Sequence, residues 1–379
     1  MSVQGEAELY LKSSRPIRTG GRCCEKNTCS GVELLVKIPN DLGYVLPFIK
    51  CNAMQSSWIQ AEQLAHLSNQ SSAACIVPLP GFDVLRVHGP DAEKYLQSQT
   101  TCDLKRLNAD NFLRGAHCDA KGKMWSVFHL LQQNSNDLLV VAYRDELAAS
   151  LAQWQKFGVF SKVSFEPGQQ QWAVFGVTGA EEAVKQLLQQ LGFSLLQSGQ
   201  RQQHQGMHLL ALTGDHYLVL CSHQQAHQWL TDSALPFAAP TRWLQAHIQH
   251  GFCYLEQENI GQFVPQMLNL QALDAISFDK GCYLGQEMVA RMKYLGKNKR
   301  AAYILSAPAD STPVAGSDIE MQLDTNWRRA GQVINAVNVN QQLWLLAVLP
   351  NDTTANTPLR LATEPESLLT LQPLPYTLQ

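Results

Sequence analysis

Hydrophobic positions recur along the chain with two periods, one typical of strands and one typical of helices. A short apolar run at residues 84–87 precedes Gly89, Pro90 and Asp91, which favour the start of a helix at residues 92–99. Further apolar or alternating segments of strand length follow, and a second amphipathic helix is indicated by its spacing. The elements expected in this part are strands at 84–87, 113–118, 124–131, 138–142 and 159–165, and helices at 92–99 and 145–157.

The same rhythm of strand, helix, strands and helix is repeated in the following segment. The elements expected there are strands at 172–177, 208–212 and 217–221, and helices at 180–191 and 224–230. This repeat predicts two split β-α-β layers, an α+β arrangement. A further helix is expected at residues 242–250, where Gly251 provides a C-terminal cap.

Helical periodicity ends after Arg300, and short strands separated by turn residues take its place. Strands are expected at residues 303–305, 332–337 and 343–348. This pattern predicts a small C-terminal β-barrel. The domains that we expect are a first layer at residues 54–170, a second layer at 171–299 and the barrel at 300–379.

The composition is that of a folded protein of 379 residues, with 45% hydrophobic and 16% charged residues. This apolar content suffices for two or three packed domains. The formal net charge of −3 argues against a polycation that coats nucleic acid or anionic membranes. The longest apolar run, residues 343–349, is far shorter than the roughly 20 residues of a membrane-spanning helix. We therefore expect a soluble protein with no membrane partner.

Residues 1–53 differ from the rest of the chain. They contain seven Lys or Arg, five Asp or Glu, the adjacent Cys23 and Cys24, and Cys29. This cysteine spacing matches no common zinc or iron–sulfur motif, so no metal site is expected. The absence of an apolar signal-peptide core and the ten scattered cysteines indicate a cytoplasmic protein with reduced thiols. We interpret residues 1–53 as a disordered extension that precedes a folded part beginning near Met54.

The densest group of unusual residues lies at the end of the expected second layer. It reads Lys280-Gly281-Cys282-Tyr283-Leu284-Gly285-Gln286-Glu287. Residues 280–300 contain six basic residues and one acid. A cation near a cysteine favours the reactive thiolate, and flanking glycines leave the sulfur accessible. We therefore expect Lys280 to lower the pKa of Cys282. The alternative is a buried structural cysteine beside a basic strand.

Other candidate motifs carry less information. His223 and His227 lie four residues apart on an expected helix, but no third metal ligand is evident nearby. No glycine-rich phosphate loop is present in the sequence. Residues 119–123 are interpreted as a hairpin turn between two strands.

The segment 280–287 resembles the signature of the YgfZ-type folate-binding proteins, which are relatives of the aminomethyltransferase (T-protein) of the glycine cleavage system. The resemblance extends from about Met54 to the end of the chain. Its other segments are 116–125, 160–163, 261–266, 269–273, 326–329 and 373–376. It implies a fold of two ferredoxin-like layers and a β-barrel, arranged around a central cavity that binds folate.

The resemblance also implies the residues of the site. The functional motif is Cys282 and Lys280, with Tyr283, Gly285, Gln286 and Glu287. The family's two folate-contacting aromatic positions fall on Phe82 and Trp243, and its pterin-facing glutamate falls on Gln249. Phe82 stands where close relatives have Trp, so an indole donor is lost. Gln249 offers one acceptor oxygen where a carboxylate offers two, which weakens the expected hold on a pterin.

The function implied by the resemblance is assembly or repair of iron–sulfur enzymes, including those that thiomethylate tRNA. Tetrahydrofolate or a derivative is the implied cofactor, and client iron–sulfur enzymes are the implied partners. We favour a non-catalytic folate-binding factor. Aminomethyl transfer is not expected, because residues 123–129 lack the catalytic aspartate of the T-protein.

Two alternatives stay open beside this interpretation. The first is a folate-dependent one-carbon transferase or demethylase. The second is an RNA-binding module that uses the basic residues between Lys293 and Arg300. Because Tyr294 is the one aromatic residue in that segment, it lacks a stacking platform for single strands. We therefore expect no direct contact with nucleic acid.

Overall fold

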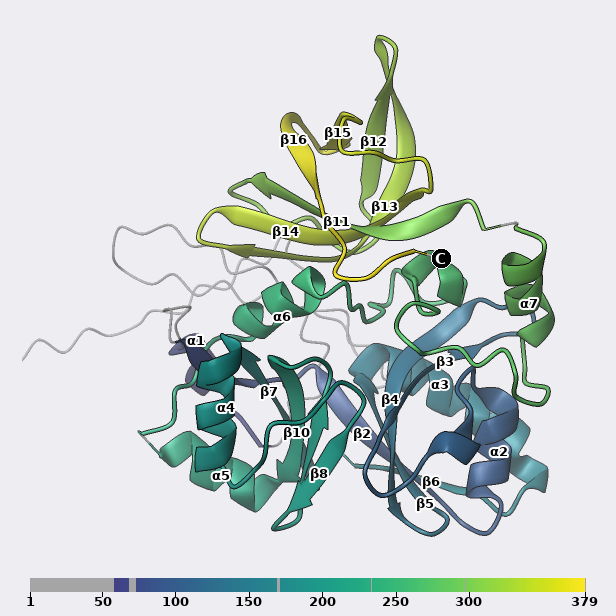
Figure 1. Ribbon diagram of the computed structural model, residues 1–379, viewed down its shortest axis with the longest axis vertical. Helices are drawn as coiled ribbons and strands as arrows, with labels where there is room; N and C mark the ends of the chain where they lie inside the picture. The colour runs from purple at the N-terminus through teal and green to yellow at the C-terminus, as the bar shows by residue number, and fades with distance from the viewer. Residues whose placement is uncertain (1–57, 68–72, 169–170, 233, 297, 379) are drawn as a thin grey trace, which may run out of the picture. The chain divides into compact units, whose positions relative to one another are not determined.

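The computed structural model describes residues 58–67, 73–168, 171–232, 234–296 and 298–378. These residues form two antiparallel sheets with flanking helices and a closed β-barrel (Figure 1). The expectations for residues 1–53, including Cys23, Cys24 and Cys29, lie outside the described residues. None of the described helices has the length and apolar character needed to cross a membrane.

The first sheet has the strand order β3-β4-β5-β2-β6, and all its pairings are antiparallel. Its strands are β2 (Phe82–His88), β3 (Leu113–Cys118), β4 (Met124–Asn134), β5 (Asp137–Tyr143) and β6 (Ser164–Pro167). One face is covered by α2 (Ala92–Gln99) and α3 (Arg144–Phe157), and the 3-10 turn η1 (Leu104–Arg106) follows α2. Leu147 and Trp154 of α3 share a buried cluster with Leu85 and Val87 of β2.

The second sheet has the order β1-β7-β10-β9-β8 and is also antiparallel. Its strands are β1 (Ala74–Pro78), β7 (Trp172–Gly179), β8 (Arg201–His204), β9 (Met207–Ala211) and β10 (His216–Ser222). The helices on one face are α1 (Ala61–Ala65), α4 (Glu181–Gln190) and α5 (His223–Thr231). Val184 and Leu188 of α4 and Ala226 of α5 pack in one cluster with Phe175 of β7.

The remaining faces of the two sheets pack against each other. Along β10, Tyr217, Val219 and Cys221 join the core beneath the helices, whereas Leu218 and Leu220 join the core between the sheets. Successive side chains of a strand point to opposite faces, so a strand buried on both sides is apolar at nearly every position. The continuous apolar run of β10 therefore reflects its place in the middle of a layered fold.

Strand β1 corrects the expected boundary between the two layers. Residues 54–170 are expected to belong to the first layer, but β1 pairs with β7 of the second sheet, with Ala74 opposite Gly179. Ile76 faces the core beneath the helices, and Cys75 and Val77 face the core between the sheets. The first described strand thus belongs to the second sheet, and the chain then crosses to the first sheet. A pairing between strands so distant in sequence leaves no local signal.

One further local expectation is wrong, and one helix was not expected. Residues 159–165 are expected to form one strand, but the chain forms the 3-10 turn η2 (Gly158–Phe160) before the short strand β6. Val159 and Phe160 are exposed, so their β-favouring side chains have no sheet against which to pack. The other difference is helix α7 (Gln286–Tyr294), which sequence periodicity does not predict.

The β-barrel expected after residue 300 is confirmed. Its strands are β11 (Arg300–Pro308), β12 (Asp318–Leu323), β13 (Asn326–Val339), β14 (Gln342–Pro350), β15 (Leu359–Leu361) and β16 (Glu364–Gln372). The barrel closes because β16 pairs with β11. Along β14, Leu343, Leu345 and Ala347 fill the barrel interior, whereas Leu346 and Val348 belong to a different core cluster.

That second cluster lies at the junction of the sheets and the barrel (Figure 1). We call residues 250–285 the junction segment. Helix α6 (Pro240–Gln249) and the junction segment together supply much of this cluster. Leu255 and Leu268 of this segment pack with Met124 of the first sheet and Ile334 of the barrel. The junction segment contains little regular structure beyond the 3-10 turn η3 (Pro265–Leu268).

A buried segment without regular structure needs other partners for its backbone polar groups. The side chain of Asn335 in the barrel accepts a hydrogen bond from the backbone N–H of Tyr254 at 3.2 Å. Asn269 of the junction segment donates to the carbonyl oxygen of Ala302 in the barrel at 2.7 Å. Side-chain amides thus join the barrel to the segment on which both sheets also pack.

Candidate functional site

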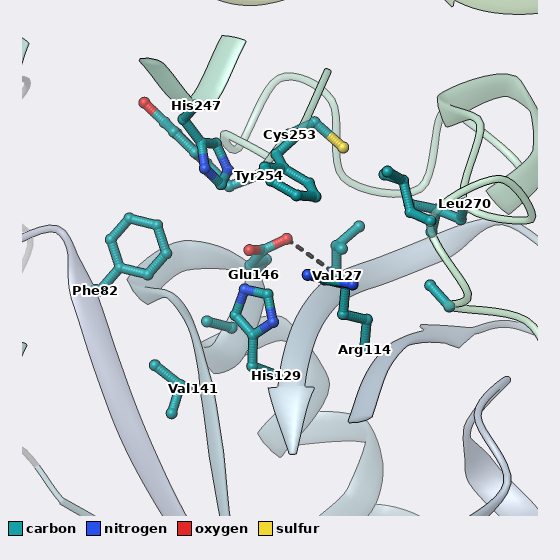
Figure 2. A pocket seen from close by; sticks show the side chains of 14 residues that line it. Phe82, Arg114, Val127, His129, Val141, Glu146, His247, Cys253, Tyr254 and Leu270 are labelled. Atoms are coloured by element: carbon teal, nitrogen blue, oxygen red, sulfur yellow. Dashed lines mark hydrogen bonds between the residues drawn. The ribbon is translucent and has the colours of Figure 1, made fainter. Parts of the chain in front are cut away.

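A small cavity of about 20 Å³ lies where the first sheet, α6 and the junction segment meet (Figure 2). A cavity of this size has room for about one water molecule. Most of the side chains that line it are apolar or aromatic, and a few are polar. The lining residues are Phe82, Arg114, Val127, His129, Val141, Ala142, Glu146, His247, Phe252, Cys253, Tyr254, Leu270, Leu273 and Ala275.

Phe82, which the family resemblance places at the folate site, lines this cavity. Its ring meets the rings of Tyr143, Trp243 and Tyr254 edge to face, with ring centres 5.8, 5.4 and 5.8 Å away. Tyr143 and Tyr254 stack on each other with centres 4.3 Å apart. These rings occupy the space that a flat heterocycle would need, so a ligand of that size requires some of them to move.

The other two residues expected to contact folate lie outside the cavity lining. Trp243 is 1% exposed and packs on Gly176, where an added Cβ atom would lie 2.0 Å from its Cδ1 atom. Gln249 is exposed at the last position of α6. The cavity-lining residue of α6 is His247, which stacks on Trp243 at 4.3 Å. Two residues rotate a helix by about 200°, which turns Gln249 away from the side that His247 occupies.

Glu146, in the first turn of α3, is a fully buried acid in the cavity wall. Its carboxyl oxygens accept hydrogen bonds from the backbone N–H groups of Val127, Tyr143 and Leu255 at 2.9, 3.1 and 3.1 Å. Burial raises the pKa of Glu146 to about 8, although these three donors act in the opposite direction. The carboxyl group therefore holds a proton in most molecules at neutral pH, and it links β4, α3 and the junction segment.

Two buried histidines lie behind the aromatic wall. His216 Nε2 is 3.1 Å from His247 Nδ1, so one ring donates a hydrogen bond to the other. Burial holds the pKa of both imidazoles well below the usual range, and both rings are neutral at neutral pH. His247 thus presents an uncharged polar ring to the cavity.

Arg114 and His129 form the polar end of the cavity. They are opposite each other on β3 and β4, and Figure 2 shows their side chains next to one another. Arg114 Nη2 donates to the carbonyl oxygen of Leu212 at 2.5 Å, but its buried Nε has no hydrogen-bond partner among the described residues. The same holds for the buried Nδ1 atom of His129. Burial lowers the pKa of His129 to about 3, and the charge of Arg114 adds to this effect.

The functional motif at residues 280–287 lies outside the cavity lining. Lys280 is 8% exposed, and its Nζ donates to the carbonyl oxygens of Gln97, Thr100 and Cys102 at 2.7, 2.7 and 2.6 Å. Burial lowers the pKa of Lys280 to about 8. The Lys280 ammonium is thus bound to the end of α2, where the helix dipole favours a cation.

Cys282 lies between two anchored residues of this motif. Its side chain is exposed, whereas the five other described cysteines are buried. Tyr283 is buried, and its ring centre lies 5.1 Å from Lys280 Nζ. The loop therefore holds Cys282 at the surface between a buried cation and a buried ring. This exposure agrees with the expectation of an accessible thiol.

The motif packs on the hairpin turn at residues 119–123, which forms as expected. Gly285 adopts a φ of 84° before α7, and an added Cβ would lie 2.5 Å from the carbonyl oxygen of Asp119. Only glycine fits such a close approach at a positive φ without strain. Glu287 is exposed and forms a helix-surface ion pair with Arg291 at 2.6 Å. Gln286 is the first residue of α7.

Sequence reasoning did not select Arg114, His129 or Glu146. A signal for the first two was present, because each is polar within a strand whose neighbouring residues are largely apolar. Glu146 has no comparable signal, since an acid in the first turn of a helix is ordinarily an exposed partner of the helix dipole. Only the packing of the junction segment over α3 buries it.

The fold and the cavity define a class of protein in which two sheets and a barrel meet on one irregular segment. The aminomethyltransferase T of the glycine cleavage system from Bartonella henselae has this fold. The likeness has a TM-score of 0.62 and covers 83% of this chain and 88% of that chain. The two sequences are 13% identical, so the comparison shows the shared fold alone. The expected α+β architecture with a C-terminal barrel is confirmed.

The chain belongs to the YgfZ family. It is 40% identical over 308 residues to the tRNA-modifying protein YgfZ of Yersinia pestis (strain Pestoides F), covering 80% of this chain and 92% of that protein. The protein of the same name from Yersinia enterocolitica is 39% identical over 319 residues, covering 82% of this chain and 95% of that protein. The family described as "YgfZ, beta-barrel domain" matches residues 298–364.

The buried carboxyl group of Glu146 predicts a dependence of stability on pH. Because its pKa in the folded state is raised to about 8, the folded protein keeps a proton that the unfolded chain releases above about pH 4.5. We expect its contribution to the free energy of unfolding to decrease between about pH 4.5 and pH 8, with an upper limit of ~5 kcal/mol. Urea denaturation across this range measures the change.

Glu146→Gln removes this titration and should flatten the profile, whereas the same substitution at the exposed Glu366 should leave the profile as in the wild type. An unchanged slope in Glu146→Gln would show that Glu146 is ionised in the folded protein throughout this range.

Lys280 is predicted to stabilise the fold through its three carbonyl partners. Lys280→Met keeps the aliphatic stem but leaves these oxygens without their donor, so we expect a loss of about 1–3 kcal/mol in the free energy of unfolding. Lys94→Met, at an exposed position of α2, serves as the matched control and should change it by less than about 0.5 kcal/mol. Equal stability of both variants would argue against the anchoring role of Lys280.

Proposed function

We propose that the protein is a folate-binding accessory factor for the assembly or repair of iron–sulfur enzymes, including those that thiomethylate tRNA. Membership of the YgfZ family and the names of its relatives support a role in tRNA modification. Tetrahydrofolate or a derivative is the proposed ligand, and client iron–sulfur enzymes are the proposed partners. The proposed site of action is the cytoplasm, a reducing compartment that suits the six unpaired cysteines of the described residues.

The observation that carries the folate proposal is the aromatic cavity at the junction of the sheets and the barrel. Phe82 offers a ring for stacking, and Glu146 and His247, whose hydrogen bonds hold the cavity wall in place, contribute neutral groups to that wall. Flat heterocycles with polar edges are bound by this combination of aromatic surface and few polar groups. The cavity volume of about 20 Å³ means that binding must include a shift of the aromatic side chains.

The part of the site proposed to act on clients is the motif at residues 280–287. Cys282 is its exposed nucleophile, and a surface thiol is within reach of a partner protein. Lys280 holds the loop in place through its three backbone hydrogen bonds. We therefore assign ligand binding to the cavity and client contact to Cys282.

Tetrahydrofolate titration followed by intrinsic Trp fluorescence tests the first half of the proposal. We expect saturable binding that Phe82→Ala weakens about 5- to 150-fold, because stacking on an aromatic ring is worth ~1–3 kcal/mol. Phe165→Ala, a substitution of a ring in the core between the first sheet and its helices, serves as the control and should leave affinity unchanged.

Two results would contradict this half of the proposal. The absence of saturable binding to the wild type would remove folate as the ligand. Turnover of methylene- or formyl-tetrahydrofolate with an acceptor would favour a one-carbon transferase, since a binding factor shows saturation without turnover.

The second half predicts that Cys282→Ser separates ligand binding from activity in cells. Because Cys282 lies outside the cavity lining, the variant should bind tetrahydrofolate within about twofold of the wild-type affinity. It should also lose most of the thiomethylated nucleosides of total tRNA, measured by mass spectrometry in cells that carry it in place of the wild type.

Gly281→Ala is the control for an altered loop, because its added methyl group meets no atom within 4 Å. Normal levels of thiomethylated nucleosides in the Cys282→Ser cells would refute the proposed role of the thiol.

A further inference from the structure

We propose that Arg114 and His129 form an anion-binding subsite of the cavity, which takes the carboxylate group of the ligand. This inference deepens the proposed function, because it concerns the same cavity and assigns a chemical group that the ligand must carry. The resemblance to the family does not single out either residue.

The first observation is that several nitrogen atoms of Arg114 and His129 have no hydrogen-bond partner among the described residues. Arg114 Nη2 donates hydrogen bonds to the carbonyl oxygen of Leu212 and, at 3.3 Å, to Ser198 Oγ. Nε is buried and unpartnered, and Nη1 has no hydrogen bond to any residue that the structure describes. His129 Nδ1 is buried and unpartnered beside it. Buried polar atoms are almost always satisfied in native proteins, so a set of such atoms on one cavity wall indicates a ligand.

The second observation is that Arg114 forms no ion pair with any acid in the described part of the chain. Asp274 is the acid whose charge acts on it, but Asp274 is exposed and bound to Arg106 at 2.8 Å. Glu146 lines the same cavity and is largely protonated at neutral pH. Burial lowers the pKa of Arg114 to about 10, which leaves the guanidinium charged. A buried cation without an anion is costly, so an anionic ligand group would be strongly favoured at this position.

The third observation concerns the shape and charge of the subsite. The rings of Phe112 and Phe252 lie 5.4 and 5.2 Å from the guanidinium carbon, so the guanidinium is held between aromatic side chains. Among the described residues that line the cavity, Arg114 is the one Lys or Arg. One positive charge balances a carboxylate, whereas a phosphate dianion would need a second cation. The guanidinium also presents parallel N–H groups that match the two oxygens of a carboxylate.

A structural role for Arg114 makes a different prediction from a role in ligand binding. The carbonyl oxygen of Leu212 also accepts a hydrogen bond from Ser198 Oγ at 2.8 Å. Removing Arg114 therefore leaves this carbonyl with a partner. Replacing an uncompensated buried charge by an apolar side chain is often neutral or stabilising. The unliganded Arg114→Met protein should thus be at least as stable as the wild type.

The experiment compares three probes on the full chain by isothermal titration calorimetry. They are tetrahydrofolate, which carries carboxylates, tetrahydrobiopterin, which has a pterin ring and no carboxylate, and sodium benzoate, which has a carboxylate and no pterin. We expect Arg114→Met to weaken tetrahydrofolate and benzoate about 10- to 150-fold, as for loss of a charge-assisted hydrogen bond. Tetrahydrobiopterin affinity should stay within about twofold.

Two variants sharpen the comparison. Arg114→Lys keeps the charge without the planar fork, and its affinity for tetrahydrofolate should lie between those of the wild type and Arg114→Met. Arg201→Met removes another buried arginine, which donates to the carbonyl oxygen of Ala109 and does not line the cavity. It should leave all three affinities unchanged.

The outcomes separate this inference from the proposed function. If the wild type binds tetrahydrofolate and Arg114→Met binds it equally well, the anion subsite is wrong and folate binding stands. If neither pterin binds but benzoate binding depends on Arg114, the subsite stands and the folate proposal fails. Equal weakening of tetrahydrofolate and tetrahydrobiopterin, or a marked loss of stability in the unliganded Arg114→Met protein, would assign Arg114 a structural role and overturn the subsite.

Discussion

The fold depends on satisfying the backbone of the junction segment, an irregular stretch buried between the sheets and the barrel. A buried N–H or carbonyl group without a partner costs about as much as a lost hydrogen bond, so each group of such a segment needs a specific donor or acceptor. Here several of the partners are polar side chains from the first layer and the barrel. Glu146 reaches from α3, Asn335 reaches from the barrel, and Asn269 returns a bond to the barrel strand β11. These hydrogen bonds join the first layer and the barrel to the same segment.

The same constraint distinguishes the residues that support the cavity from those available to a ligand. The oxygens of Glu146 are engaged by three backbone N–H groups, and His247 is engaged by His216. Arg114 and His129 differ, because each has a buried nitrogen that no residue described in the structure satisfies. A protein interior accepts unsatisfied atoms rarely, and it accepts them where function requires them. The polar residues of the cavity thus divide into a supporting group and a group whose buried nitrogens have no hydrogen-bond partner among the described residues.

The motif at residues 280–287 contains residues that hold its loop in place and, between them, one exposed cysteine. Lys280 and Gly285 are explained by packing: one binds the end of α2, and the other allows the loop to approach the turn at residues 119–123. Cys282 has no such explanation, since its side chain is exposed between them. Residues of this motif that suggest a catalytic centre in the sequence therefore mainly hold the loop in position in the structure. These contacts hold the loop so that the thiol of Cys282 is exposed at the surface.

Local patterns in the sequence determined much of the secondary structure. Strand β3 and helix α2 have the bounds expected from apolar spacing and from the Gly-Pro-Asp start signal, and a barrel follows residue 300 as the turn-rich pattern indicates. Such features depend on neighbours within a few residues, which a single sequence displays directly. The motif at residues 280–287 also predicts an accessible thiol at Cys282, and the side chain is exposed in the structure.

Tertiary structure alone decided the features that join distant residues. Strand β1 pairs with β7, although all the strands of the first sheet lie between them in the sequence. Arg114 lies opposite His129 because of the register in which β3 and β4 pair. Trp243 resembles a ligand-stacking residue in sequence but is packed on Gly176. Burial and hydrogen-bond partners are properties of the whole packed chain, and the same side chain can support a core or face a ligand. For this protein the sequence determined many of the elements and the motif, whereas packing around the junction segment decided which buried polar groups have hydrogen-bond partners among the described residues.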